Sequence, residues 1–122
     1  MEISQGDIYW VTIRREETKG SEQFGRRPFI VVSRLGVNRT IKTVVVVPLT
    51  TTTDNEPPYR IVIPVSEIIK EISCKSQLEL SVAKTDQIRV IDKSRLEEKI
   101  GRLSQTATLS VTLGLAYVFD LR

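Results

Sequence analysis

The chain has 122 residues, a length that fits one domain. Its composition, 40% hydrophobic and 27% charged, is ordinary for a globular protein and excludes a disordered or fibrous chain. A single cysteine, Cys74, excludes an internal disulfide framework and a thiolate zinc cage, and favours a reducing compartment. Because histidine is absent, no histidine base, Ser-His-Asp triad or histidine-bound metal can be built from this sequence.

The net charge of +3 is concentrated in the first third of the chain. Residues 1–42 contain eight basic and five acidic side chains, which leaves ten of each, from totals of 18 and 15, for the remainder. Six of those eight bases are arginines, whose planar fork matches the oxygens of a phosphate group. The pattern favours a nucleic-acid or phosphate ligand, and a solvated basic surface is the alternative.

No targeting or membrane segment is predicted. Residues 1–6 carry Glu2 and lack the apolar core of a secretory signal. The longest uncharged segment, residues 104–119, is shorter than the roughly 20 apolar residues that span a bilayer, and it contains several Ser and Thr. We therefore expect a soluble cytoplasmic protein with no membrane partner.

Three strands are predicted in the first half of the chain. Residues 7–13, 28–33 and 43–49 are rich in β-branched and aromatic residues, and the first segment is apolar at both parities, which indicates a strand covered on both faces. Residues 14–27 are polar and contain two glycines, so we expect a long loop there, of a kind that is usually functional or disordered. Residues 36–39 are typical of a turn.

The middle of the chain predicts one more strand and a short helix. Residues 50–58 have the composition of a loop, and residues 59–65 that of a strand. Residues 66–72 are expected to form a short helix with Ser66 as its N-cap. Residues 92–103 fit a turn, a short helix or an edge strand.

Residues 87–90 alternate between polar and apolar side chains. This pattern predicts that Ile88 and Val90 face inward, whereas Gln87 and Arg89 share the opposite face. The two polar side chains would then lie together on one surface.

The run that begins at residue 104 predicts a buried C-terminal helix, although its threonines leave a strand possible. An uncharged helix with two apolar faces needs cover on both sides, and a domain this small has little interior. An interface with a second subunit is therefore one candidate for covering the helix. The two stripes are Ala107, Val111, Leu115 and Val118, and Leu109, Leu113 and Ala116.

The predicted fold class is mainly β with helices (β+α): a small β-barrel with appended helices, as one domain over residues 1–122. Reactive side chains gather at the strand ends, in residues 20–28, 49–53 and 85–92. A hairpin of the second and third strands is expected to put Arg27 and Thr50 at opposite ends. Only the curvature of a barrel would then bring them together.

Four blocks of the sequence resemble the MazF/PemK family of toxins from type II toxin–antitoxin pairs. They are GDIYWVTI at 6–13, GSEQFGRRPFIVVS at 20–33, TVVVVPLT at 43–50 and SVAKTDQIRVIDKSRLEEKIGRLS at 81–104. The resemblance implies an SH3-like barrel of the MazF/CcdB/Kid type with a C-terminal helix, and a symmetric homodimer, for which that helix is a candidate interface. It also implies a metal-independent, sequence-selective endoribonuclease without a cofactor. Such a toxin cleaves single-stranded RNA, often mRNA, inhibits translation and growth, and is neutralised by a cognate MazE/PemI-like antitoxin.

The resemblance also assigns catalytic residues. Arg27 and Thr50 match the catalytic pair of the family, and Glu22 matches an acid that either takes a proton or orients Arg27. Metal-free cleavage uses the ribose 2′-OH as an internal nucleophile, gives a 2′,3′-cyclic phosphate and a 5′-OH, and needs stabilisation of charge on the phosphate oxygens. We rank Arg27 first as a phosphate clamp, because its pKa is too high for a general acid or base.

Further positions are candidates for RNA binding. Phe24 is a candidate for base stacking, Arg26 could share the phosphate with Arg27, and Thr51 to Thr53 are close rivals of Thr50. Each candidate has a plainer alternative: Arg27 as a surface cation paired with Glu22, Thr50 as a strand-end hydroxyl, and Gln87 and Arg89 as braces of the site or the dimer. The full set is Ser21, Gln23, Phe24, Arg26, Thr51, Gln87 and Arg89.

Two other functions are compatible with the same fold. One is a non-enzymatic poison of DNA gyrase, as in the related CcdB toxins, whose poisoning surface lies near the C-terminus. Residues 117–122 here lack the features expected of that surface. The other is a catalytically silent relative that binds only its antitoxin or operator DNA, and the presence of Glu22, Arg27 and Thr50 argues against it.

Overall fold

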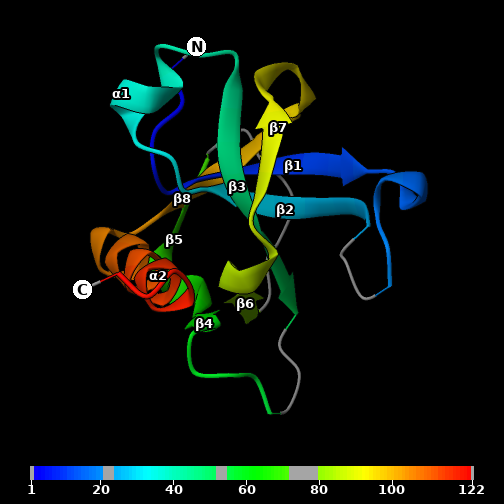
Figure 1. Cartoon of the computed structure of the whole chain (residues 1–122). Helices are drawn as coiled ribbons and strands as arrows, with labels where there is room; N and C mark the ends of the chain where they lie inside the picture. The colour runs from blue at the N-terminus through cyan, green and yellow to red at the C-terminus, as the bar shows by residue number, and fades with distance from the viewer. Residues whose placement is uncertain (1, 21–23, 52–54, 72–79, 122) are drawn as a thin grey trace.

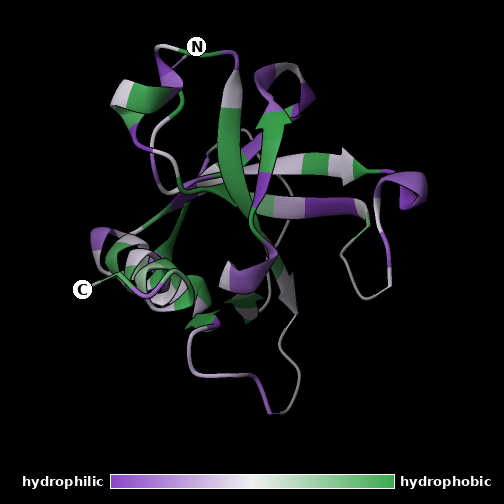
Figure 2. Ribbon diagram, viewed as in Figure 1, coloured by the Kyte–Doolittle hydropathy of each residue, from purple (hydrophilic) through white to green (hydrophobic). Residues whose placement is uncertain are grey.

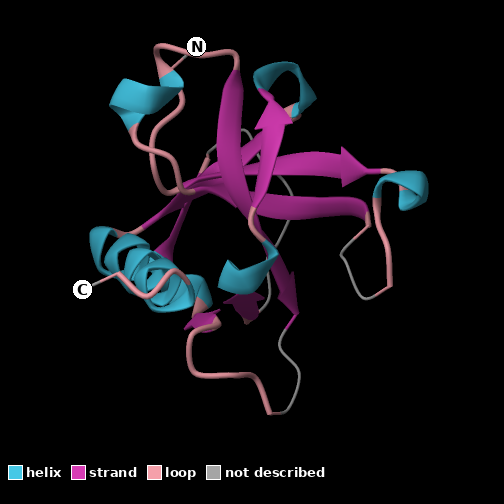
Figure 3. Ribbon diagram, viewed as in Figure 1, coloured by secondary structure: helices cyan, strands magenta, loops and turns pink. Residues whose placement is uncertain are grey.

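The strands of this protein form an antiparallel sheet that curls toward a closed barrel (Figure 3). The computed structural model describes residues 2–20, 24–51, 55–71 and 80–121. The strands within these ranges are β1 (Asp7–Ile13), β2 (Gly25–Val31), β3 (Thr43–Thr51), β4 (Ile61–Ile63), β5 (Ile68–Lys70), β6 (Ser81–Ala83), β7 (Arg89–Asp92) and β8 (Lys99–Leu103). Their order across the sheet is β4-β6-β3-β2-β1-β8-β5, and β7 also pairs with β3.

The two end strands of the sheet follow each other in the chain. Only Pro64 and the 3-10 helix η2 (Val65–Glu67) separate β4 from β5, so the two ends of the sheet are tied together. The expected mainly-β barrel with a C-terminal helix is therefore confirmed. That helix, α2 (Gln105–Val118), lies on one side of the barrel, whereas β1 and β2 extend away from it (Figure 1).

Short helical segments lie in four further connections of the described residues. They are α1 (Leu35–Asn38) and the 3-10 helices η1 (Arg15–Glu17), η3 (Thr85–Gln87) and η4 (Lys93–Arg95). The longest helix, α2, has 14 residues, and none of the helices in the described ranges is long and apolar enough to cross a bilayer.

The sheet buries apolar side chains on both of its faces, as the sequence of β1 predicts. Figure 2 shows that β3 is hydrophobic along most of its length, whereas η1 is hydrophilic. Ile8 and Tyr9 are neighbours in β1, point to opposite faces and are both buried. One cluster contains Ile8, Ile30, Val47, Leu49, Ile63, Ala83, Ile100, Leu103, Ala107 and Val111. The other contains Ile3, Tyr9, Val11, Ile13, Phe29, Val31, Val44, Val46 and Ile91.

The N-terminus of α2 is fixed to the connection between the end strands. The Ser104 hydroxyl accepts a hydrogen bond from the Ala107 backbone N–H at 3.0 Å and donates one to the Glu67 carboxylate. The Ser104 backbone N–H also donates to the Glu67 carbonyl at 2.8 Å. Ser104 is therefore an N-cap that also anchors the helix to the barrel.

We expect Ser104→Ala to lower the free energy of unfolding by about 1 kcal/mol, because it removes the cap and leaves the Glu67 carboxylate without that donor. Chemical denaturation monitored by circular dichroism measures the change. Ser110→Ala in the middle of α2 is the matched control, since its hydroxyl bonds only the Thr106 carbonyl of its own helix. Equal losses in the two variants would contradict a special role for Ser104.

The helix predicted over residues 66–72 is wrong for its described part. Ser66 lies inside η2, and residues 68–70 form β5, which pairs with β8 through Ile68 and Leu103. Cross-strand pairing and two β-branched residues outweigh the helical pattern. Ile72 lies outside the described residues.

Further details also differ from the prediction. The strand β2 begins at Gly25, so the predicted loop ends earlier. Val90 is exposed and Ile91 is buried, because η3 shifts the phase of the alternation before β7 begins. The strand β8 lies between β1 and β5, and is therefore not at an edge.

Candidate nucleic-acid interface

Arg27 lies in β2, opposite Val11 of β1, and its side chain is half-buried. Its Nε–H donates a hydrogen bond of 2.8 Å to the Phe24 carbonyl, which fixes the plane of the guanidinium. No acceptor among the described residues lies within hydrogen-bonding distance of its two terminal nitrogens. Those nitrogens can donate to a phosphate.

Thr50 lies in the last part of β3, opposite Val82 of β6, and is buried at 9% exposure. Its hydroxyl is 3.5 Å from the Thr51 carbonyl, the outer limit of a hydrogen bond. The hydroxyl is therefore weakly bound and can turn toward a ligand. Thr51 is exposed beside it, and residues 52–53 lie outside the described residues.

The pairing of β2 with β3 corrects the expectation that Arg27 and Thr50 sit at opposite ends of their hairpin. Phe29 pairs with Pro48 and Val31 with Val46, so Arg27 and Thr50 each lie two residues beyond the Phe29–Pro48 pair, at the same end of the ladder. Both are then at one end, because antiparallel strands place the start of the first beside the finish of the second.

The same register sets Arg27, Thr50 and Arg89 on one face of the sheet. Val46 pairs with Arg89 on one side and with Val31 on the other, and paired residues point to the same face. Side chains two residues apart along a strand share that face, which links Arg27 to Val31 and Thr50 to Val46.

Lys84 is a further cation next to β3, and it was not among the residues predicted from the sequence. It directly follows β6, and its backbone N–H donates to the Pro48 carbonyl of β3 at 3.0 Å. Burial lowers the pKa of the Lys84 ammonium, and the nearby charges of Arg60 and Arg27 lower it further. The feature of the sequence that points to Lys84 is its position inside the SVAKTDQIR block, one of the blocks that resemble the toxin family.

An ion-pair cluster holds η3 beside Lys84. The Arg60 guanidinium donates two hydrogen bonds of 2.7 Å to the Asp86 carboxylate, and its Nη1 lies 3.2 Å from Glu56 Oε2. The hydrogen bond to Asp86 raises the pKa of Arg60, and the bond from Arg60 lowers the pKa of Asp86. The Thr85 hydroxyl donates to the Tyr59 carbonyl at 2.7 Å. These contacts fix the segment that carries Lys84 and Gln87.

Arg26 points to the face opposite Arg27, because neighbours in a strand alternate. Its Nε–H donates to Glu97 Oε1 at 2.9 Å, and its guanidinium lies 4.5 Å from the centre of the Trp10 ring. Hydrogen bonds from Thr12 and Arg26 lower the pKa of Glu97. Arg26 and Arg27 are therefore neighbours in the sequence whose side chains lie on opposite faces of the sheet.

The remaining candidates are divided around the site. Arg89 begins β7 and its Nη2 is 3.7 Å from Glu17 Oε2, and Gln87 is half-buried at the end of η3. Phe24 is exposed, with the Arg15 guanidinium 5.0 Å above its ring. Ser21, Glu22 and Gln23 lie outside the described residues.

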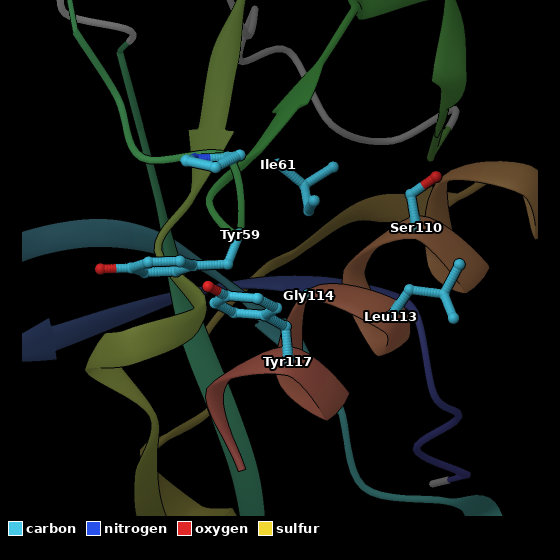
Figure 4. A pocket seen from close by; sticks show the side chains of 7 residues that line it. Tyr59, Ile61, Ser110, Leu113, Gly114 and Tyr117 are labelled. Carbon is cyan, nitrogen blue, oxygen red and sulfur yellow. The ribbon is translucent and has the colours of Figure 1, made fainter. Parts of the chain in front are cut away.

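A separate apolar hollow lies between α2 and the approach to β4 (Figure 4). Its volume is about 330 Å³, and Leu113, Ile61 and the stacked rings of Tyr59 and Tyr117 line it. The ring centres are 5.6 Å apart with planes 12° from parallel. Gly114 is required here, because a Cβ would lie 2.5 Å from the Tyr59 carbonyl oxygen.

Among the described residues, no group of three or more Cys, Asp and Glu side chains is placed to hold a metal ion.

Comparison with known proteins identifies the class. A family model for the PemK-like, MazF-like toxin of type II toxin–antitoxin systems matches residues 4–119. The endoribonuclease MazF of Staphylococcus epidermidis is 31% identical over 109 residues, which cover 89% of this chain and 84% of that protein.

Solved structures share the fold. A crystal structure of MazF from Deinococcus radiodurans has a TM-score of 0.75 at 21% identity and covers 98% of each chain. A mycobacterial endoribonuclease in complex with its cognate antitoxin has a TM-score of 0.70 at 21% identity, and covers 99% of this chain and 96% of that chain. The fold is thus that of a small barrel toxin. The chain belongs to the PemK-like, MazF-like toxins of type II toxin–antitoxin systems, which confirms the resemblance found in the sequence.

Proposed function

We propose that this toxin is a sequence-selective endoribonuclease that cleaves single-stranded RNA, mRNA included, without a metal ion. The observation that carries the proposal is the set of Arg27, Thr50 and Arg89 on one face of the sheet, with Lys84 bonded through its backbone to the same strand, β3. Guanidinium forks, a hydroxyl and an ammonium gathered on these neighbouring strands suit a phosphodiester. The relative named endoribonuclease MazF supports the same reaction.

The proposed reaction is an internal displacement at phosphorus. The ribose 2′-oxygen loses its proton to a base and bonds to phosphorus, the bond from phosphorus to the 5′-oxygen breaks, and that oxygen gains a proton. The products are a 2′,3′-cyclic phosphate and a 5′-OH. Negative charge builds on the two other phosphate oxygens, where the terminal nitrogens of Arg27 and the Thr50 hydroxyl would donate. Glu22 is the candidate base, or else orients Arg27.

The test is digestion of mixed-sequence RNA by the purified toxin in excess EDTA, with the 5′-OH ends mapped by sequencing. We expect cuts at a short common sequence, and the map would supply the cleavage site. Purified gyrase with supercoiled DNA is the parallel assay. Intact RNA together with arrested gyrase would favour the gyrase poison, and inactivity in both assays would favour a catalytically silent relative.

Lys84 gives the proposed site a pH dependence. A lysine whose pKa is lowered loses its charge at a lower pH than an ordinary lysine, so its contact with a phosphate weakens as the pH rises through the folded pKa. We expect the affinity for 2′-O-methyl RNA, which resists alkali, to fall with rising pH in the wild type. In Lys84→Arg this fall is expected to disappear, because arginine stays protonated. Identical pH profiles would exclude Lys84 from the contact.

We further infer that the toxin forms a homodimer through α2. The helix carries no charged residue, and apolar side chains remain exposed on it and just beyond it. Two neighbouring copies would cover these side chains. They are Leu109, Leu113, Tyr117, Phe119 and Leu121.

Leu113→Glu is expected to convert the dimer into a monomer of 13.8 kDa, because it places a charge in the middle of the apolar surface. Size-exclusion chromatography with light scattering measures the mass. Val90→Glu is the matched control, since Val90 is as exposed as Leu113 but lies on β7. A wild type that is already monomeric, or a Leu113→Glu protein that stays dimeric, would exclude α2 as the interface.

The same family membership supports an antitoxin partner, in the manner of the MazE–MazF complexes among the structural relatives. We infer that an acidic segment of the antitoxin binds the Arg-rich N-terminal region, whose charge surplus attracts it. The free toxin would then cut mRNA in the cytoplasm and arrest translation and growth, and the bound toxin would not.

A further inference from the structure

The short helix η1 is held against the barrel by one acidic side chain. Glu17 Oε2 accepts a hydrogen bond of 2.8 Å from Arg95, and it is 3.7 Å from the Arg89 guanidinium. Arg95 also donates to the Thr12 carbonyl of β1 at 2.9 Å, and Arg89 lies in β7. The two arginines therefore link Glu17 to two strands of the sheet. The described residues 15–17 that follow β1 are therefore held in a defined position.

This anchor places Arg15 over Phe24. The Arg15 guanidinium lies 5.0 Å from the centre of the Phe24 ring, within the range of a cation–π contact. The Phe24 side chain remains 41% exposed although the guanidinium covers part of it. An aromatic ring with a guanidinium on one side and solvent on another has an open surface on which a flat group can stack.

The stacked pair is joined directly to the proposed phosphate clamp. The Phe24 carbonyl accepts the Nε–H of Arg27 at 2.8 Å, so the backbone of the stacking residue fixes the guanidinium. Because Phe24 and Arg27 are only three residues apart and bonded to each other, a nucleotide with its phosphate on Arg27 has a base within reach of this segment. Proteins that bind unpaired RNA stack bases on aromatic rings and guanidinium planes in this way.

We propose that Arg15 and Phe24 form a base-stacking subsite for a nucleotide beside the scissile phosphate, and that Glu17 is the positioning residue that holds it. The proposal rests on the proposed function, because it needs single-stranded RNA at Arg27. It adds two residues, Arg15 and Glu17, to the RNA site. The base meets the ring by stacking, which tolerates several bases, so the subsite contributes affinity more than discrimination.

The experiment uses an RNA that spans the mapped cleavage site, with a 2′-O-methyl group at the scissile ribose and 2-aminopurine on either side of it in turn. Stacking quenches 2-aminopurine fluorescence. We expect quenching at one of the two positions by the wild type. In Phe24→Leu the quenching is expected to be lost and the dissociation constant to rise about tenfold, with the salt dependence of binding unchanged.

Two further variants separate the ring and the charge. Phe24→Tyr keeps the ring and is expected to keep both the quenching and the affinity. Arg15→Ala is expected to weaken binding and to reduce the quenching, because the guanidinium no longer covers one side of the Phe24 ring. Arg34→Ala removes one exposed charge at the start of α1, away from this connection, and is expected to bind as the wild type does.

Glu17→Gln tests the anchor. We expect it to raise KM several-fold with kcat nearly unchanged, because the subsite loses its position while Arg27 and Thr50 remain. Glu16→Gln, next to it and also exposed, is the matched control.

The possible failures are distinguishable. If the wild type cleaves and binds RNA, but Phe24→Leu keeps both affinity and quenching, the subsite is excluded and the nuclease stands. Loss of binding in Phe24→Tyr equal to that in Phe24→Leu would also exclude stacking. If the wild type neither cleaves nor binds RNA, the proposed function and the subsite both fail.

Discussion

Arg27→Ala is expected to lower the rate of RNA cleavage at least about 1,000-fold, because it removes the donors proposed for the phosphate oxygens as charge builds on them. The fold should survive, since the backbone pairing of residue 27 with Val11 does not depend on the side chain. Single-turnover cleavage of the mapped RNA measures the loss, and circular dichroism with light scattering checks the fold and the dimer.

Two companion variants make the result specific. Arg27→Lys keeps the charge but not the fork, so we expect it to recover binding more than cleavage. Arg34→Ala removes the same charge elsewhere and should cleave normally. Cleavage by a folded Arg27→Ala protein at the wild-type rate would end the assignment of Arg27 to the phosphate.

Gly101→Ala is expected to lower the free energy of unfolding by about 3 kcal/mol, and the melting temperature by about 10 °C. A Cβ at this position would lie 2.2 Å from the Ile69 carbonyl oxygen and 2.9 Å from the Lys70 Cα. Both contacts are with backbone, so β5 would have to move away from β8.

Gly36→Ala is the control for this change. A Cβ on Gly36 in α1 meets nothing within 4 Å, so the substitution should leave stability unchanged or raise it slightly. Thermal unfolding of the two variants in parallel is the measurement. Equal melting temperatures would show that β5 can shift freely at the end of the sheet.

Local sequence was a good guide where burial is continuous. The strand β1 keeps its predicted bounds because apolar residues at both parities leave only a strand with two covered faces. The stripe of Ala107 and Val111 on α2 likewise predicts its buried side. Arg27 and Thr50 were found through the resemblance of their motifs, and their roles stay predictions.

The rest depended on partners distant in sequence. The local sequence of residues 68–70 favours a helix, and only their pairing with β8 makes them a strand. The alternating pattern predicts a buried Val90, and only the presence of η3 before it changes that prediction. Lys84 looks like any surface lysine until its backbone bond to Pro48 of β3 is known. The position of Arg27 and Thr50 at one end of their hairpin, by contrast, needs no distant partner, because antiparallel strands bring the start of one beside the finish of the next.

The contact of Ser104 with Glu67 links the C-terminal helix to the turn between β4 and β5. Glu67 belongs to the short turn that brings the last strands of the sheet together, and Ser104 starts the helix that covers one core cluster. Detaching the helix therefore also loosens the connection between β4 and β5 that closes the barrel. On heating, helical and tertiary signals should vanish in a single cooperative transition.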